Sequence, residues 1–144
     1  MIRAAATASQ QLRKMASSAI PQIKNVDIDP RGTFKYILIK VSCPDSDGKF
    51  EDKLIVRGYA ECGYHSDIND KVTDELQALK SSKVIKDWRS KVLGGGRIKH
   101  DPGAKTINVY GYSQGFGKAD HELSVDIIKT QYPSYQITWS DEGY

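Results

Sequence analysis

The stretch KLIVRGYAECGYHSDIND, from Lys53 to Asp70, holds the pattern that decides the fold. It begins with the apolar run Leu54–Val56, typical of a buried strand, and Gly58 and Gly63 break the loop that follows. Apolar residues then recur at helical spacing, at Ile68, Val72, Leu76 and Leu79. We therefore predict a strand, a loop and a helix from Ser66 to Lys80, with the serine as N-cap.

His65 lies immediately before this predicted helix. The first backbone N–H groups of a helix lack partners and the macrodipole there is positive, so phosphate binds well and an imidazolium is disfavoured. A neutral imidazole beside an anion site is a candidate general base, although a histidine in such a loop can also be a solvated residue without a role. Arg57, at the end of the strand, is either a supporting contact to the anion or a surface charge.

The run TFKYILIKVS, Thr33 to Ser42, gives the strongest strand signal in the chain. Both of its faces are largely apolar, which predicts a central strand paired as a hairpin with the strand that starts at Lys53. Lys35 shares a face with branched aliphatic residues. An ammonium buried there without a partner would cost several kcal/mol, unless its side chain reaches solvent.

The segment from Ser81 to Lys91 is basic around Trp88, and we predict a solvated connector there. RNA binding is the disfavoured alternative, because one aromatic residue and no RNP or KH signature are present.

Asp101-Pro102-Gly103 fits a type II turn, so the flanking runs RIKH and KTINVYGY should form a hairpin. Arg97 opens the first of these strands beside three glycines.

The loop GYSQGFG, Gly111 to Gly117, can present convergent N–H groups to an anion, although many glycine-rich turns have no such function. After it we predict a short helix from Val125 to Tyr132, capped by Ser124 and ended by Pro133. The run YQITW, Tyr135 to Trp139, is the last predicted strand.

The composition fits one soluble domain: 144 residues, 39% hydrophobic and 27% charged, with a formal net charge of +3. No apolar run is long enough to span a membrane, and the mild charge does not by itself indicate nucleic acid. Two isolated cysteines favour a reducing compartment, so we expect a cytoplasmic protein. We also expect it to be a monomer. The acid-free residues 1–24 read as a disordered extension or a mitochondrial targeting segment before a domain at 25–144.

Several phosphate chemistries are excluded by missing motifs. The chain has no GxxxxGK[ST] loop, no cysteine followed by arginine six positions on, and no RHG triplet. Asp27 and Asp29 are spaced DxD but lack the preceding apolar strand of an aspartyl-phosphate enzyme. Cys62 and His65 supply only a C-x-x-H pair, whereas structural zinc needs four ligands, so we predict no metal.

Taken together, the motifs FKYILIKV, IVRGY, YHSDI, LGGGRIKH, VYGYS and ITW resemble the phosphohistidine phosphatase (janus/ocnus) family, in order from Val26 to Tyr144. The resemblance implies a single compact α/β (α+β) domain: a mixed β-sheet of about six strands with two main helices packed on its faces. It also implies hydrolysis of the P–N bond of phosphohistidine on proteins, without metal or cofactor. Some relatives also act on phospholysine.

The resemblance also implies roles for single residues. His65 matches the catalytic histidine, as general base on water or, less favoured, as nucleophile. The matching phosphate-binding positions are Lys35, Arg97, Ser113, Gln114 and Gly115, with Arg57 in support. His100 and His121 fall at family histidines and are expected to have secondary roles.

The chain departs from the family pattern in its longer connector and in Gln114 and Gly115, which leaves substrate preference open. A different function class also stays open: the same pocket could capture phosphorylated peptides without turnover.

Overall fold

A computed structural model describes residues 20–141 of the chain. Its elements are β1 (Val26–Ile28), β2 (Gly32–Pro44), β3 (Phe50–Gly58), α2 (His65–Ser81), β4 (Arg89–Asp101), β5 (Thr106–Tyr110), α3 (His121–Lys129) and β6 (Gln136–Trp139). The strands form one six-stranded sheet in the order β1-β3-β2-β4-β5-β6. Its two outermost pairs are parallel and the others antiparallel, so the predicted mixed sheet with two helices is confirmed.

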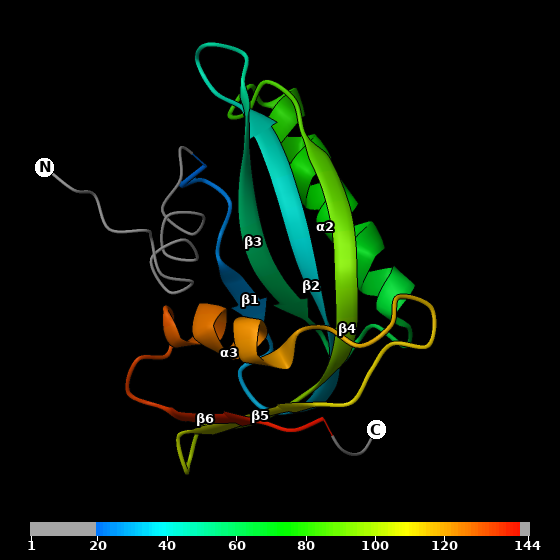
Figure 1. The fold of residues 1–144 in the computed structure, drawn as a ribbon, viewed down its shortest axis with the longest axis vertical. Coiled ribbons are helices and arrows are strands. Elements are labelled where there is room, and N and C mark those ends of the chain that lie inside the picture. The colour runs from blue at the N-terminus through cyan, green and yellow to red at the C-terminus, as the bar shows by residue number, and fades with distance from the viewer. Residues whose placement is uncertain (1–19, 142–144) are drawn as a thin grey trace, which may run out of the picture.

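Strand β2 lies between β3 and β4, as its two apolar faces predicted. Phe34, Tyr36 and Leu38 belong to the core that α3 covers. Ile37 and Ile39 belong to the core that α2 covers. Figure 1 shows α2 running along the three long strands, while α3 crosses near β5 and β6. The sheet is therefore buried on both sides, and Lys35 points toward the α2 side.

Both predicted helices are present, but their N-caps differ from the prediction. Helix α2 begins at His65 with Tyr64 as N-cap, because the Asp67 carboxylate accepts the Tyr64 backbone N–H at 3.0 Å. Helix α3 begins at His121, where the Asp120 side chain accepts the Leu123 N–H at 3.1 Å. The predicted caps, Ser66 and Ser124, lie inside these helices. In each case an aspartate carboxylate at the helix start prevails over the serine: Asp67 lies three residues after the N-cap of α2, and Asp120 is itself the N-cap of α3.

The predicted solvated connector is partly wrong. Strand β4 starts at Arg89 rather than at Arg97, so residues 89–92 are part of the sheet. Ile85 is buried and Trp88 packs against the α2-side core. Because the segment is mostly polar and rich in lysine, its composition did not indicate that Ile85 and Trp88 pack against the core.

The β4–β5 hairpin is confirmed, with Asp101 paired to Thr106. The predicted type II turn is wrong, because Gly103 does not have the positive φ that this turn requires. Instead Lys105 adopts φ 54°, and the Asp101 side chain accepts the Ala104 N–H at 3.1 Å. The aspartate therefore organises a longer turn by accepting a hydrogen bond from the backbone three residues further on.

The last residues of the predicted extension pack onto the domain. Ile20 and Ile23 are buried in the α2-side core, and the Lys53 ammonium donates to both of their carbonyl groups. Residues 1–19, and with them most of the possible targeting segment, lie outside the described residues. None of the helices in the described part of the chain is both long and apolar enough to span a bilayer.

Candidate active site

Three consecutive glycines in β4, Gly94 to Gly96, let other segments approach the strand closely. A Cβ atom on Gly95 would lie 2.8 Å from His65 Cδ2 and 3.1 Å from Ser113 Cβ. A Cβ atom on Gly96 would lie 2.7 Å from His121 Cε1. Only glycine fits at such distances. His65 therefore packs against Gly95, beside Ser113, and His121 packs against Gly96.

A pocket of about 540 Å³ opens at this point. It lies where the N-terminus of α2 meets the loop between β5 and α3, the two segments that Figure 1 shows side by side. Its lining consists of Lys35, Gly63, Tyr64, His65, Ser66, Ser113, Gln114, Gly115 and Phe116. Five of the predicted site residues, on three segments far apart in the sequence, thus meet in one cavity.

His65 is 7% exposed, and its Nε2 lies 3.0 Å from the Gly96 carbonyl oxygen. A carbonyl can only accept, so Nε2 carries the proton and Nδ1 carries the lone pair. Burial lowers the pKa of His65 below 6.5; the Gly96 bond opposes this, and the charges of Lys35 and Arg97 lower the pKa further. His65 is therefore a neutral base with a fixed tautomer at neutral pH.

Lys35 and Arg97 are directly paired across β2 and β4, so their side chains leave the same face of the sheet. Lys35 is partly buried and lines the pocket, and the described residues give it no carboxylate partner. Arg97 does not line the pocket, but its charge acts on His65. The cation that looked misplaced on an apolar strand face is therefore available to an anion in the cavity.

The loop after β5 is held as a tight turn. Ser113 and Gly117 exchange backbone hydrogen bonds of 3.0 and 2.8 Å, and Ser113 Oγ accepts the Phe116 N–H at 3.1 Å. The backbone N–H groups of Gln114 and Gly115 have no acceptor among the described residues, and both residues line the pocket. Two unpaired amides thus belong to residues that line a cavity which also receives the N-terminus of α2, and this makes the cavity suited to phosphate.

Arg57 is not brought to the pocket. It is buried, and its Nε and Nη2 donate to the two carboxylate oxygens of Glu75 in α2, at 3.1 and 2.9 Å. The predicted phosphate contact is thus replaced by an ion pair that joins β3 to α2. The sequence could not reveal this, because Glu75 looks like any charged residue on a helix surface.

The other two histidines are buried in hydrogen-bond networks. His100 Nδ1 lies 2.8 Å from the Asp29 carbonyl oxygen. His121 Nε2 donates to the Gly111 carbonyl oxygen at 2.7 Å, and its Nδ1 lies 2.6 Å from the Tyr36 hydroxyl. His121 therefore fixes the start of the pocket loop. No three His, Cys, Asp or Glu side chains in the described part of the chain cluster as metal ligands.

Sequence reasoning assigned no pocket role to Tyr64 or Phe116, although both line the cavity. It also missed the Gly96 carbonyl that orients His65. The first two lie within the motifs already noted, next to His65 and within the glycine-rich loop, so adjacency was an available signal. The carbonyl had none, because any residue provides one.

The family model of the Janus/Ocnus family (Ocnus) matches residues 20–136. The chain belongs to the Janus/Ocnus family. One curated member, the 14 kDa phosphohistidine phosphatase of Sus scrofa, is 47% identical over 131 residues, covering 90% of this chain and 98% of that protein. The resemblance found in the motifs is thus confirmed.

Other Janus/Ocnus members carry a different name. The sex-regulated protein janus-A of Drosophila pseudoobscura pseudoobscura is 43% identical over 134 residues, 92% of this chain and 85% of that protein. The janus-A protein of Drosophila melanogaster is 42% identical over 133 residues, 92% of this chain and 90% of that protein. All three alignments cover nearly the whole domain, so the pocket segments fall within the shared region.

Proposed function

We propose that this chain is a protein phosphohistidine phosphatase, which hydrolyses the P–N bond of phosphohistidine on protein substrates. The observation that carries the proposal is a neutral, oriented His65 in one cavity with the Lys35 cation and two unpaired loop amides. Family membership supports it, because a relative that covers most of the chain bears the name of this activity.

In the proposed mechanism the pocket binds the phosphoryl oxygens first. Lys35 and the N–H groups of Gln114 and Gly115 contact these oxygens, and the first-turn amides of α2 add their positive dipole end. In the transition state the charge of the transferring group is spread over its three equatorial oxygens, so donors aimed at these oxygens lower the barrier as well as bind the substrate. Arg97 adds long-range positive charge from the neighbouring strand position.

The reaction then needs one proton carrier. His65 Nδ1 accepts a proton from water while the water oxygen forms its bond to phosphorus and the P–N bond breaks. The same proton passes to the nitrogen of the departing imidazole, so the products are inorganic phosphate and an unmodified histidine side chain. Because Nε2 stays bonded to Gly96 throughout, the imidazole keeps its orientation. His65 acts here as a base and not as a nucleophile, so no phosphorylated His65 accumulates.

We propose that this chemistry is independent of metal. The positive charge that a metal would contribute to phosphoryl transfer is supplied by Lys35 and the amide donors. Phosphohistidine-bearing proteins are the proposed substrates. We retain the expectation of a cytoplasmic monomer, and two buried free cysteines, Cys43 and Cys62, support a reducing compartment.

The test is release of phosphate from a phosphohistidine peptide and from phosphoramidate, with and without EDTA. The proteins are the wild type, His65→Ala and, as a control on the same helix, the exposed Gln77→Ala. We expect kcat/KM to fall by about 10² to 10⁴ in His65→Ala only, and EDTA to change nothing.

Other results would give different conclusions. If His65→Ala turned over substrate as fast as the wild type, the assignment of His65 as general base would be wrong. Loss of wild-type activity in EDTA would overturn metal independence. If the wild type binds the peptide without releasing phosphate, the chain is a phosphopeptide-binding module that shares the pocket.

A further inference from the structure

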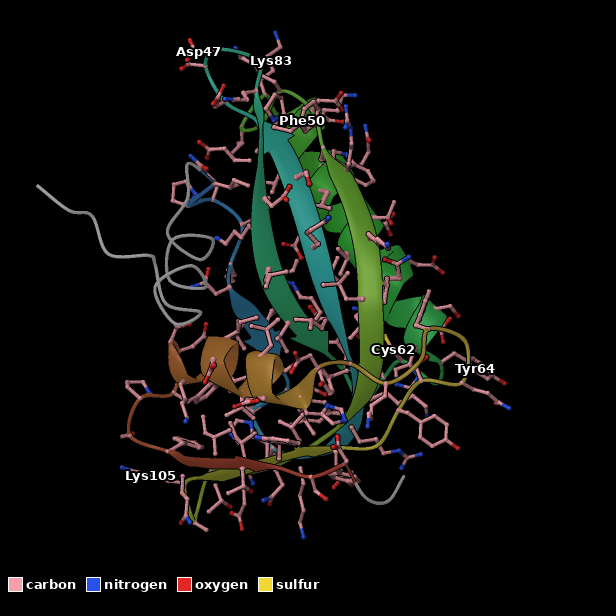
Figure 2. The ribbon with its side chains drawn as sticks, in the orientation of Figure 1. Asp47, Phe50, Cys62, Tyr64, Lys83 and Lys105 are labelled. Carbon is pink, nitrogen blue, oxygen red and sulfur yellow. The ribbon has the colours of Figure 1, made fainter. Side chains whose placement is uncertain are left out.

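The pocket has two aromatic walls that the phosphate chemistry does not use. Tyr64 and Phe116 line the cavity from opposite segments, the N-cap of α2 and the loop after β5. Figure 2 labels Tyr64 at the outer edge of the molecule, near Cys62 and beside that loop. Tyr64 is 72% exposed, more than any other exposed large apolar side chain of the described residues.

Tyr64 is held in place by its backbone rather than by its ring. Its N–H donates to the Asp67 carboxylate, and its carbonyl accepts the Asp67 N–H at 3.1 Å. Neither of these two bonds involves the aromatic ring. The cap therefore does not require an aromatic side chain, and nothing in the packing explains why a large ring stands at the mouth of the cavity.

The positions of the groups indicate what the ring contacts. Lys35 and the amides of Gln114 and Gly115 receive the phosphoryl oxygens, and His65 faces the same cavity. At about 540 Å³ the cavity exceeds what a phosphoryl group alone fills, so it also receives the group bonded to phosphorus. In phosphohistidine that group is a flat aromatic ring, and in phospholysine it is a flexible alkyl chain.

We propose that Tyr64 and Phe116 form a subsite for the imidazole ring of phosphohistidine and thereby select this substrate over phospholysine. The inference rests on the proposed function and adds the recognition of the leaving group to it. A flat ring gains from stacking on an aromatic side chain and has few rotatable bonds to restrict on binding. A lysine chain gains less from the ring and loses more freedom.

The test compares three substrates: a phosphohistidine peptide, the same peptide with phospholysine, and phosphoramidate, which has no organic group. The variants are Tyr64→Leu, Phe116→Leu and Tyr64→Phe, with Trp139→Leu as control because Trp139 is 43% exposed outside this pocket. We expect the ratio of kcat/KM for phosphohistidine over phospholysine to fall about threefold to tenfold in Tyr64→Leu and Phe116→Leu. Tyr64→Phe and Trp139→Leu should keep the ratio.

An unchanged ratio in Tyr64→Leu and Phe116→Leu would overturn the subsite. So would an equal loss on phosphoramidate and on the phosphohistidine peptide, because it would indicate damage to the phosphate site.

A binding measurement separates this inference from the proposed function. A peptide with a phosphotriazole side chain, a stable analogue of phosphohistidine, is titrated against wild type and Tyr64→Leu, with a phosphoserine peptide as reference. If wild type releases no phosphate but Tyr64→Leu lowers the affinity for the triazole peptide only, the proposed function fails and the subsite holds. If Tyr64→Leu lowers the affinity for both peptides equally, the subsite fails.

Discussion

One hydrogen bond gives His65 its chemical character. Its Nε2 donates to Gly96, which leaves Nδ1 free to take a proton, and burial keeps the imidazole neutral. The position of His65 beside a helix N-terminus was predictable from the YHSD motif. The partner was not, since Gly96 lies 31 residues further along the chain. Long-range backbone pairing, which sets the tautomer here, leaves no signal in a single sequence.

The Lys35 ammonium acts on both the substrate phosphate and the His65 base. In Lys35→Met we expect KM for phosphohistidine peptide to rise about tenfold, because a charge-assisted contact is lost. The pKa of His65 should rise, because a cation that lowers it is gone. Since the base works only when neutral, the acidic limb of kcat/KM should move to higher pH. Lys40→Met, on the opposite face of β2, should show neither effect; a limb that stays in place in Lys35→Met would contradict this account.

At the scale of elements, β4 and α2 are brought together by the absence of side chains. Gly95 lies between the Tyr36 carbonyl, His65 and Ser113, each within 3.1 Å of where its Cβ would be. The GGGR motif was visible in the sequence, and the family resemblance implied a phosphate-binding role for its arginine. Which helix would pack against the glycines was not readable, because β4 and α2 have no local relation.

We therefore expect Gly95→Ala to shift His65 or the Ser113 loop. Its activity on phosphoramidate should fall tenfold or more, with a stability loss of about 1–3 kcal/mol. Gly103→Ala is the matched control: its Cβ would come no nearer than 3.4 Å to its neighbour and its φ is not positive. Steady-state kinetics and urea unfolding measure the two effects. Wild-type kinetics in Gly95→Ala would mean that the close approach has no catalytic importance.

The Arg57–Glu75 pair links β3 to α2 away from the pocket, so it should serve stability alone. Glu75→Gln leaves a buried guanidinium without its charge partner and should cost about 3 kcal/mol in urea unfolding. Glu61→Gln is the control, because the Glu61–Lys71 pair is exposed and should contribute little. Kinetics of the folded Glu75→Gln protein should match the wild type. A raised KM in Glu75→Gln would instead indicate that Arg57 contributes to phosphate binding.

At the scale of the whole molecule, the sequence predicted the type and number of elements better than their joining. Alternation in Thr33–Ser42 predicted a central strand, and β2 occupies that place. The parallel edge pairings of β1 and β6 had no local signal, since they join segments far apart in the chain. The predicted domain start at residue 25 also left out Ile20 and Ile23, which are buried in the domain. Polar residues surround them in the sequence, so no apolar pattern marked them.

These two isoleucines give a stability prediction for the N-terminal edge of the domain. Ile23 is 0% exposed, so Ile23→Ala should destabilise the full chain by about 2–5 kcal/mol through lost burial and a cavity. The neighbouring Gln22 is exposed, and Gln22→Ala should change stability little. Thermal and urea unfolding measure both. Equal stability of the two variants would show that the domain begins after this segment.

The most direct test of the account is a ¹⁵N NMR titration of His65 combined with the pH profile of kcat/KM for phosphohistidine peptide. We predict a neutral tautomer protonated at Nε2, a pKa below 6.5, and an acidic limb of kcat/KM with the same pKa. A neutral tautomer protonated at Nδ1, or a kcat/KM that does not change as His65 titrates, would contradict the role of His65 as the general base.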